Sequence, residues 1–308
     1  MRIYIIASCL FFSVCKSDIY AQTGPALPIQ FLQFFKTYNL MNPASIGRIS
    51  PGEISLGNKS LLGDFSSIRT SYVHANAQLN ASSAAVSRQV IGLTFINDRE
   101  GSFINTNRAS LLYAYHLPIS AHLKLNAGAA MGFLNYAYSP SNISAGGSAF
   151  APNADIGLWL HNPDFNIGIS GNQIIPAKLT PIAQTYTIRR YYNFIADKKF
   201  PLNPYVSLTT AFMYRSYKDF NSADLALILL IHDNLSVALA YKYKKGASIS
   251  GGLEDIRLGS HVLKVMFSYY SPLTSITSYN PQSLEFSFQF IPAAKHLQGG
   301  RISSGDEE

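Results

Sequence analysis

Few residues in this sequence have the types and spacing that catalysis or metal binding requires. No Gly-x-Ser-x-Gly, Walker-type or dinucleotide-binding motif occurs. His116 lies near Ser110 and Tyr115, but this pairing is too arbitrary to predict a nucleophile and its base. We therefore expect no catalysis, cofactor or bound metal. The histidines show no metal-ligand spacing; they are His74, His116, His122, His161, His232, His261 and His296.

Six basic residues share one feature, because each falls on the polar side of an alternating stretch. They are Arg108, Lys124, Arg215, Lys242, Lys244 and Lys264. If these stretches are strands of a barrel, the six side chains point inward and form a positive lumen that prefers anions or binds an acidic peptide segment. The plainer interpretation is that they are hydrated or paired inside, since a charge facing lipid costs about 2–4 kcal/mol near the midplane.

The elements that must position these residues are long alternating stretches, clearest between Gln89 and Tyr138. In one of them, apolar residues at odd positions from Leu123 to Phe133 oppose polar or small residues at even positions. Successive side chains of a strand point to opposite faces. These runs last about 8–14 residues, longer than an ordinary strand of about 5–6 and close to the 9–11 that cross a bilayer. We therefore predict an all-β protein, a closed antiparallel transmembrane β-barrel in a single domain.

Composition supports a membrane barrel over other classes. Charged residues make up 13% of the chain, against about 25% in soluble domains, yet no apolar run reaches 18 residues, which argues against a helical membrane protein. The 19 Tyr and 19 Phe cluster near strand ends, as interfacial girdles do. A large soluble β-sandwich is the alternative. The net charge of +7 is scattered, so we expect no nucleic-acid partner.

The two ends of the chain are expected to lie outside the barrel. Residues 1–22 are predicted to be a secretory signal peptide, which would remove both Cys9 and Cys15. A lipoprotein is the alternative there, because Ile6-Ala7-Ser8-Cys9 resembles a lipobox. Residues 23–50 would form an N-terminal periplasmic segment and 51–291 the barrel. The polar tail 292–308 is predicted to be disordered and periplasmic.

About fourteen strands are predicted, an even number that leaves both ends of the barrel's chain on the periplasmic side. The stretches Ser139–Asn153 and Ile174–Gln184 are predicted to be loops that offer contact surfaces. The predicted strands lie near residues 52–59, 66–78, 89–97, 104–117, 121–137, 154–161, 164–171, 185–197, 203–217, 221–232, 235–245, 247–253, 259–271 and 283–290.

The N-terminal segment carries the most specific motifs. Gln33, Phe34 and Phe35 form an aromatic box, and Asn42-Pro43-Ala44 with Gly47 follows after a short spacer. On physical grounds alone, Phe31, Phe34 and Phe35 would tuck this segment against the base of the barrel. The two motifs together resemble the PorP/SprF family of outer-membrane proteins, which serve type IX secretion and gliding. The resemblance extends through Gly92–Gly101 to Phe133. A Tyr-Arg-x-Gln-Trp box common in that family is missing from the region Ser55–Leu62.

The resemblance implies a location and partners. The chain would lie in the outer membrane of a Gram-negative cell, in contact with its lipid, and would meet secreted cargo proteins and periplasmic or outer-membrane secretion components. It would hold cargo at the cell surface or help to export it, and the family-motif residues would make a family-specific contact. The alternative function is a porin-like diffusion channel for small, in particular anionic, solutes, with no cofactor in either case.

Overall fold

The structure is a computed structural model that describes residues 28–79, 87–141, 145–182, 185–218, 220–273 and 281–293. The predicted signal peptide and residues 294–308 of the predicted tail lie outside the described residues. None of the helices in the described ranges is long and apolar enough to cross a membrane.

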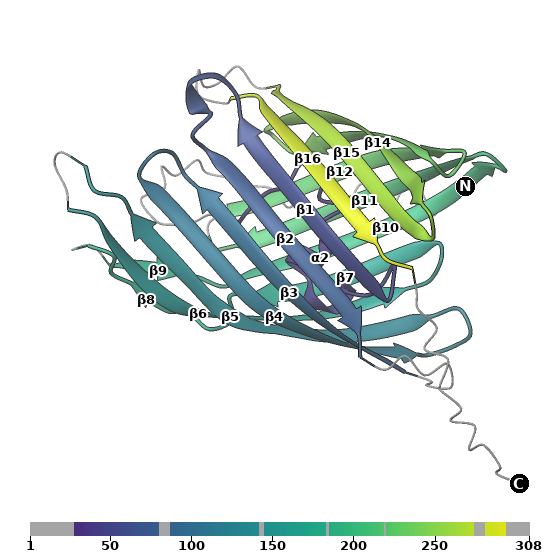
Figure 1. Cartoon of the computed structure of the whole chain (residues 1–308), viewed down its shortest axis with the longest axis horizontal. Coiled ribbons are helices and arrows are strands. Elements are labelled where there is room, and N and C mark those ends of the chain that lie inside the picture. The colour runs from purple at the N-terminus through teal and green to yellow at the C-terminus, as the bar shows by residue number, and fades with distance from the viewer. Residues whose placement is uncertain are drawn as a thin grey trace, which may run out of the picture.

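Fourteen strands form one closed antiparallel barrel (Figure 1), which confirms the predicted fold class and strand number. Each strand pairs with its neighbours in the chain, and the last closes the wall by pairing with the first, Leu56 opposite Phe288. The strands are β1 Gly52–Leu61, β2 Arg69–Gln78, β3 Arg88–Arg99, β4 Ile104–Pro118, β5 Lys124–Tyr138, β6 Gly147–His161, β7 Phe165–Asn172, β10 Tyr191–Asn203, β11 Val206–Tyr217, β12 Phe220–Ile231, β13 Leu235–Lys242, β14 Gly246–Leu258, β15 His261–Pro272 and β16 Ser283–Ile291.

Burial alternates along the strands as the sequence pattern predicts. On β4, Ser110, Leu112 and Ala114 point inward and are buried, whereas Leu111 and Tyr113 point outward and are 48% and 43% exposed. The outward set is mostly apolar, with exposed side chains such as Val73, Leu93 and Leu239, which suits a surface that faces hydrocarbon. Because β16 pairs with β1, the barrel has no terminal edge strand of the kind that an open sheet exposes.

The two ends of the barrel differ. At the terminal end, where β1 begins and β16 ends, most connections are short, such as 162–164, 204–205 and 259–260. The 79–87 connection is the exception. The loop end, opposite, carries longer connections, among them 139–146 and 173–190. Short turns on the periplasmic side and long loops outside are typical of outer-membrane barrels.

Two predicted boundaries were wrong. β6 begins at Gly147, so half of the predicted loop Ser139–Asn153 is strand. Pro152 is tolerated there because β7 pairs with β6 only from Ile156 onward, which leaves that stretch of β6 with one neighbour. The predicted strand 185–197 is two elements. Tyr186–Ile188 is β9, which pairs with β8 (Ala177–Leu179) in a small hairpin, and β10 begins at Tyr191.

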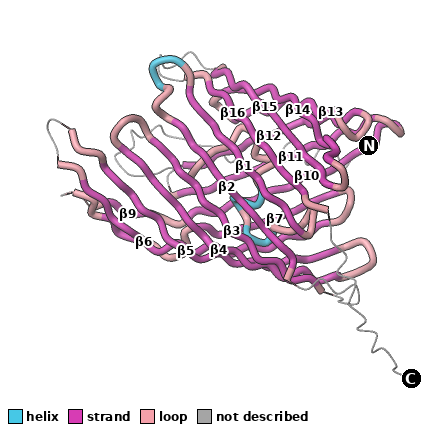
Figure 2. Tube along the Cα trace, viewed as in Figure 1, coloured by secondary structure: helices cyan, strands magenta, loops and turns pink. Residues whose placement is uncertain are grey.

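Residues 28–50 run through the inside of the barrel. They contain a short helix, α2 (Tyr38–Met41), and a 3-10 turn, η2 (Pro43–Ser45), and Figure 2 shows these short helices enclosed by strands. Most of their side chains are buried, and Phe34 and Ala44 are 0% exposed. The expectation that this segment lies at the base of the barrel in the periplasm is therefore corrected. Inside the barrel, the aromatic side chains of the segment are removed from water, which is energetically favourable.

Candidate functional site

The lumen segment, residues 28–50, spans the barrel from one end to the other. At the loop end, Gln30 Oε1 accepts a hydrogen bond of 3.1 Å from Lys245, which lies in the turn after β13. Toward the terminal end, Asn39 Nδ2 donates to Glu53 Oε1 over 2.9 Å, one residue after β1 begins. The chain therefore enters the described structure near the loop end and crosses the lumen before its first strand starts.

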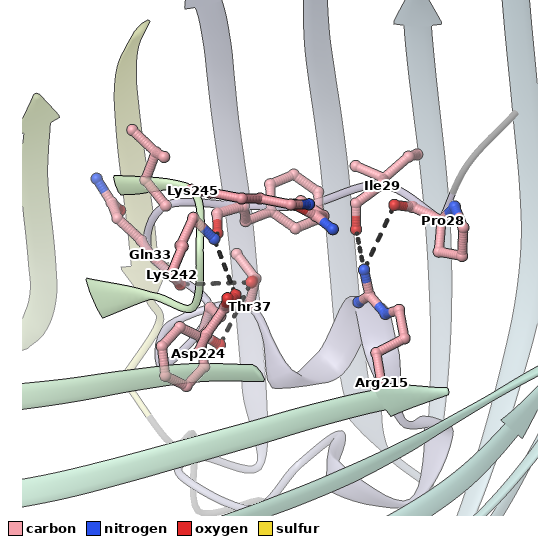
Figure 3. Close-up of polar contacts among 12 residues, drawn as sticks. Pro28, Ile29, Gln33, Thr37, Arg215, Asp224, Lys242 and Lys245 are labelled. Atoms are coloured by element: carbon pink, nitrogen blue, oxygen red, sulfur yellow. Dashed lines mark hydrogen bonds and ion pairs between the residues drawn. The ribbon is translucent and has the colours of Figure 1, made fainter. Parts of the chain in front are cut away.

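Four consecutive backbone carbonyls at the start of the segment are held by cations of the wall. Arg215 donates to the oxygens of Pro28 and Ile29, the latter over 2.8 Å (Figure 3). Lys59 donates to the carbonyl of residue 30 over 2.7 Å and Lys242 to that of residue 31 over 3.0 Å. Hydrogen bonds from charged donors are about twice as strong as neutral ones. We call this arrangement the carbonyl clamp.

The clamp is electrostatically costly and therefore needs its counter-ion. Lys242 pairs with Asp224 at 2.8 Å, and both side chains are nearly fully buried. Asp224 also neutralises part of the field of Arg215. In the turn above, burial lowers the pKa of Lys245 to about 8, and the charges of Lys242 and Lys59 act in the same direction. Cations gathered this closely are stable only while carbonyls and Asp224 face them.

Glu285 and Gln33 form the next contact along the segment. The Glu285 carboxylate on β16 accepts hydrogen bonds from the backbone N–H groups of Leu32 and Gln33. The Gln33 amide donates to Ser268 Oγ over 2.9 Å, and its carbonyl oxygen accepts from Ser287. Gln33 is 0% exposed, so every partner is needed. The first residue of the predicted aromatic box is therefore a polar anchor.

Phe34 and Phe35 supply the apolar half of the box. Their rings meet edge to face, with centroids 5.7 Å apart. They pack in one cluster with Trp159, Ile195 and Met213 of the wall. Tyr38 joins this cluster against Trp159, and the Arg48 guanidinium lies over both of those rings, 5.5 and 5.8 Å from their centroids.

Asn42 fixes the second motif to the wall. Its side-chain oxygen accepts from the Ala44 N–H over 2.9 Å, which caps the 3-10 turn that Pro43 begins. Its side-chain nitrogen donates to the carbonyls of Leu158 on β6 and Ile169 on β7, over 3.1 and 2.9 Å. The Asn-Pro-Ala box is thus buried against the protein's own strands.

Glycines hollow the wall where this box lies. A Cβ on Gly128 would lie 2.4 Å from the Ala44 nitrogen, and one on Gly157 would lie 2.0 Å from Asn42 Oδ1. Gly47, the last residue of the motif, has φ +67°, and a Cβ there would lie 2.6 Å from Val90. The Asn-Pro-Ala box can therefore lie this close to the wall only because the wall residues beside it are glycines.

The other predicted lumen charges have separate places. Lys264 lies 3.6 Å from Glu254, which also binds Lys36 of the lumen segment. Arg108 faces Asp155 and Tyr191. Lys124 stands at the terminal end of β5, away from the clamp.

Lys244 corrects the prediction, because it is exposed in the turn after β13. Its φ of 57° belongs to a left-handed turn residue, and the alternation on which the prediction relied ends at Lys242. Its ammonium lies over the ring of Tyr243, 5.4 Å from the centroid, and so outside the lumen.

Sequence reasoning missed Lys59, Asp224 and Glu285. Each stands at an inward position of its strand, and Glu285 is the only acidic residue of β16. A lone charge on an inward face was the signal that could have found them. In the part of the chain that the structure describes, no three His, Cys, Asp or Glu side chains are grouped to hold a metal ion.

Comparison with known proteins yields one family and a set of barrels. The model of the family described as type IX secretion system membrane protein PorP/SprF matches residues 24–290. No curated protein matches the chain. Among solved structures, the toluene transporter TbuX of Ralstonia pickettii is similar with a TM-score of 0.52 and 10% identity, over 82% of this chain and 91% of that one. The monoaromatic hydrocarbon channel CymD is similar with a TM-score of 0.50 and 10% identity, over 82% and 90%. Such likeness shows the fold alone.

Proposed function

The chain belongs to the PorP/SprF family of type IX secretion system membrane proteins, and from that premise we propose that it holds secreted cargo proteins at the cell surface as a closed barrel. The family and the outer-membrane barrel fold indicate an outer-membrane location. The observation that carries the proposal is the lumen segment, which fills the barrel with the protein's own chain. A barrel whose interior is occupied in this way can act through its loops and ends, where partners can reach it.

The loop end supplies a rigid surface for such a partner. The β8–β9 hairpin packs Leu179 and Ile188 against Leu134 and Tyr136 of β5, and all four side chains are buried. Next to the hairpin, Ile175 and Ile182 remain 46% and 40% exposed. An apolar surface on a braced hairpin suits recognition of another protein better than a mobile loop would.

A diffusion channel is the second candidate function. It was suggested by the inward basic residues, which in an open lumen would favour the passage of anions. Arg215 and Lys242 already donate hydrogen bonds to the lumen segment, and Lys264 lies beside Glu254. A passing anion would have to displace these partners. Gliding, the finer role within the family, stays part of the proposal.

Co-purification tests the cargo role. The tagged barrel, extracted from membranes in mild detergent, should bring down secretion components and exported cargo. Replacing Ile175 and Ile182 with Ser should reduce cargo recovery several-fold. Ile119→Ser is the matched control, because Ile119 is 54% exposed in a turn at the terminal end. Recovery of the barrel alone, with no cargo and no secretion component, would refute the proposal.

A further inference from the structure

Four basic side chains gather on the inward face at the terminal end of the barrel, and we call them the basic mouth cluster. They come from four neighbouring strands, β3 to β6, and the strand register sets them side by side. Arg88 is directly opposite His116, and Lys124 is directly opposite His161. The two imidazole rings lie edge to face with centroids 6.5 Å apart.

Among the residues that the structure describes, no acidic group pairs with the charged members of this cluster. In the described ranges, Arg88 and Lys124 make no ion pair. The charges that act on His116, Lys124 and His161 come from one another, Arg48 and Arg88, all of them basic. Arg48 has its own counter-ions, since Asp197 and Glu53 both act with it. Arg88 and Lys124 carry like charges that act on one another, and an anion bound between them would reduce this repulsion.

Each of the two histidines also has a buried ring nitrogen that no described residue hydrogen-bonds. His116 Nε2 is 2.9 Å from the carbonyl oxygen of Ile46, but its Nδ1 is buried without a partner among the described residues. His161 Nε2 is likewise buried without a hydrogen-bond partner among the described residues. The residues are 2% and 7% exposed, so bulk water does not satisfy these atoms. Because His116 Nε2 donates to a carbonyl, its Nδ1 carries a hydrogen only when the imidazole is protonated, and a bound anion favours that form.

We propose that the basic mouth cluster binds an oxyanion, a carboxylate or phosphate group, that enters through the terminal end. Arg88 and Lys124 are only partly buried and meet the anion first. The histidines lie deeper and supply the unpartnered nitrogens. None of these residues belongs to the carbonyl clamp, which holds the other end of the lumen segment, and the site does not depend on the cargo role.

Calorimetric titration of the full barrel in an uncharged detergent tests the site. Inorganic phosphate and a short polyglutamate peptide are the two probes. Binding of either supports the site: phosphate alone points to a free or lipid phosphate, and the peptide alone points to an acidic polypeptide. The double variant Arg88→Gln and Lys124→Gln should bind the probe at least about tenfold more weakly than the unmodified barrel. Each of the two substitutions removes a charged hydrogen-bond donor from the site.

Lys178→Gln is the control, because Lys178 is an exposed lysine of the β8–β9 hairpin at the opposite end. It should bind both probes as the unmodified protein does. Two results would overturn the proposal: neither probe binds the unmodified barrel, or the double variant binds as tightly as the control. Heat-modifiable migration on a gel verifies that each variant is folded.

Discussion

At the scale of single residues, the lumen is organised by a few buried charges that each serve the lumen segment. Lys242 shows this best, because one ammonium group joins a wall carboxylate, Asp224, to a carbonyl of the segment. Buried ion pairs contribute little net stability, but removal of one partner leaves an uncompensated charge. These residues therefore specify where the segment lies more than they strengthen the barrel.

Lys242→Met should destabilise the folded barrel by about 3–5 kcal/mol, since Asp224 loses its partner in a buried site. The measurement is the denaturant midpoint in detergent, followed by tryptophan fluorescence from Trp159, which lies in the same lumen. Lys244→Met is the matched control. It removes an exposed lysine two positions away and should leave the midpoint unchanged. Equal midpoints for the two variants would show that the clamp is not formed.

Gly128→Ala tests the fit between the wall and the Asn-Pro-Ala box. The added methyl group would meet the backbone of Pro43 and Ala44 at 2.4–2.6 Å, and backbone cannot move aside as a side-chain tip can. We expect a loss of about 1–3 kcal/mol in the free energy of unfolding. Gly251→Ala is the control, because a Cβ there meets nothing within 4 Å. It should leave the free energy of unfolding unchanged or raise it by at most about 1 kcal/mol. A Gly128→Ala variant as stable as Gly251→Ala would contradict the contact.

At the scale of elements, the strands could be predicted from the sequence but the place of the lumen segment could not. Period-two alternation over long runs favoured a closed barrel with an apolar outer face over the alternative of a soluble β-sandwich. The position of residues 28–50 depends on contacts such as Gln33 to Glu285, 252 positions apart. Many of these contacts use backbone carbonyls, such as those of Ile29 and Met41, which carry no signal in the residue types. The sequence predicted Arg215 and Lys242 as inward charges, but it did not predict that Asp224 would be their acidic neighbour.

Cysteine labelling tests the burial of the lumen segment. In a chain without Cys9 and Cys15, Ser45→Cys should react with a membrane-impermeant maleimide about 100-fold more slowly than Ser102→Cys, because Ser45 is 5% exposed and labelling requires the segment to open. Ser102 is exposed in the turn between β3 and β4 and serves as the control. Equal labelling rates would mean that the segment lies outside the barrel.

At the scale of the whole molecule, an apolar outer wall, a filled lumen and two unlike ends make a barrel that is built to be a fixed body in the membrane. The loop end carries the braced hairpin, and the terminal end carries the basic mouth cluster. The lumen segment joins the two ends, since its clamp lies at one and Ile46 contacts His116 near the other. The segment is therefore hydrogen-bonded to the wall near both ends.

Single-channel recording in planar bilayers tests the central claim most directly, which is that residues 28–50 close the lumen. We expect the full barrel to be silent and a variant without residues 28–46, shown by heat-modifiable migration to be folded, to pass a steady ionic current. A full barrel that conducts as much as the shortened variant would contradict the account.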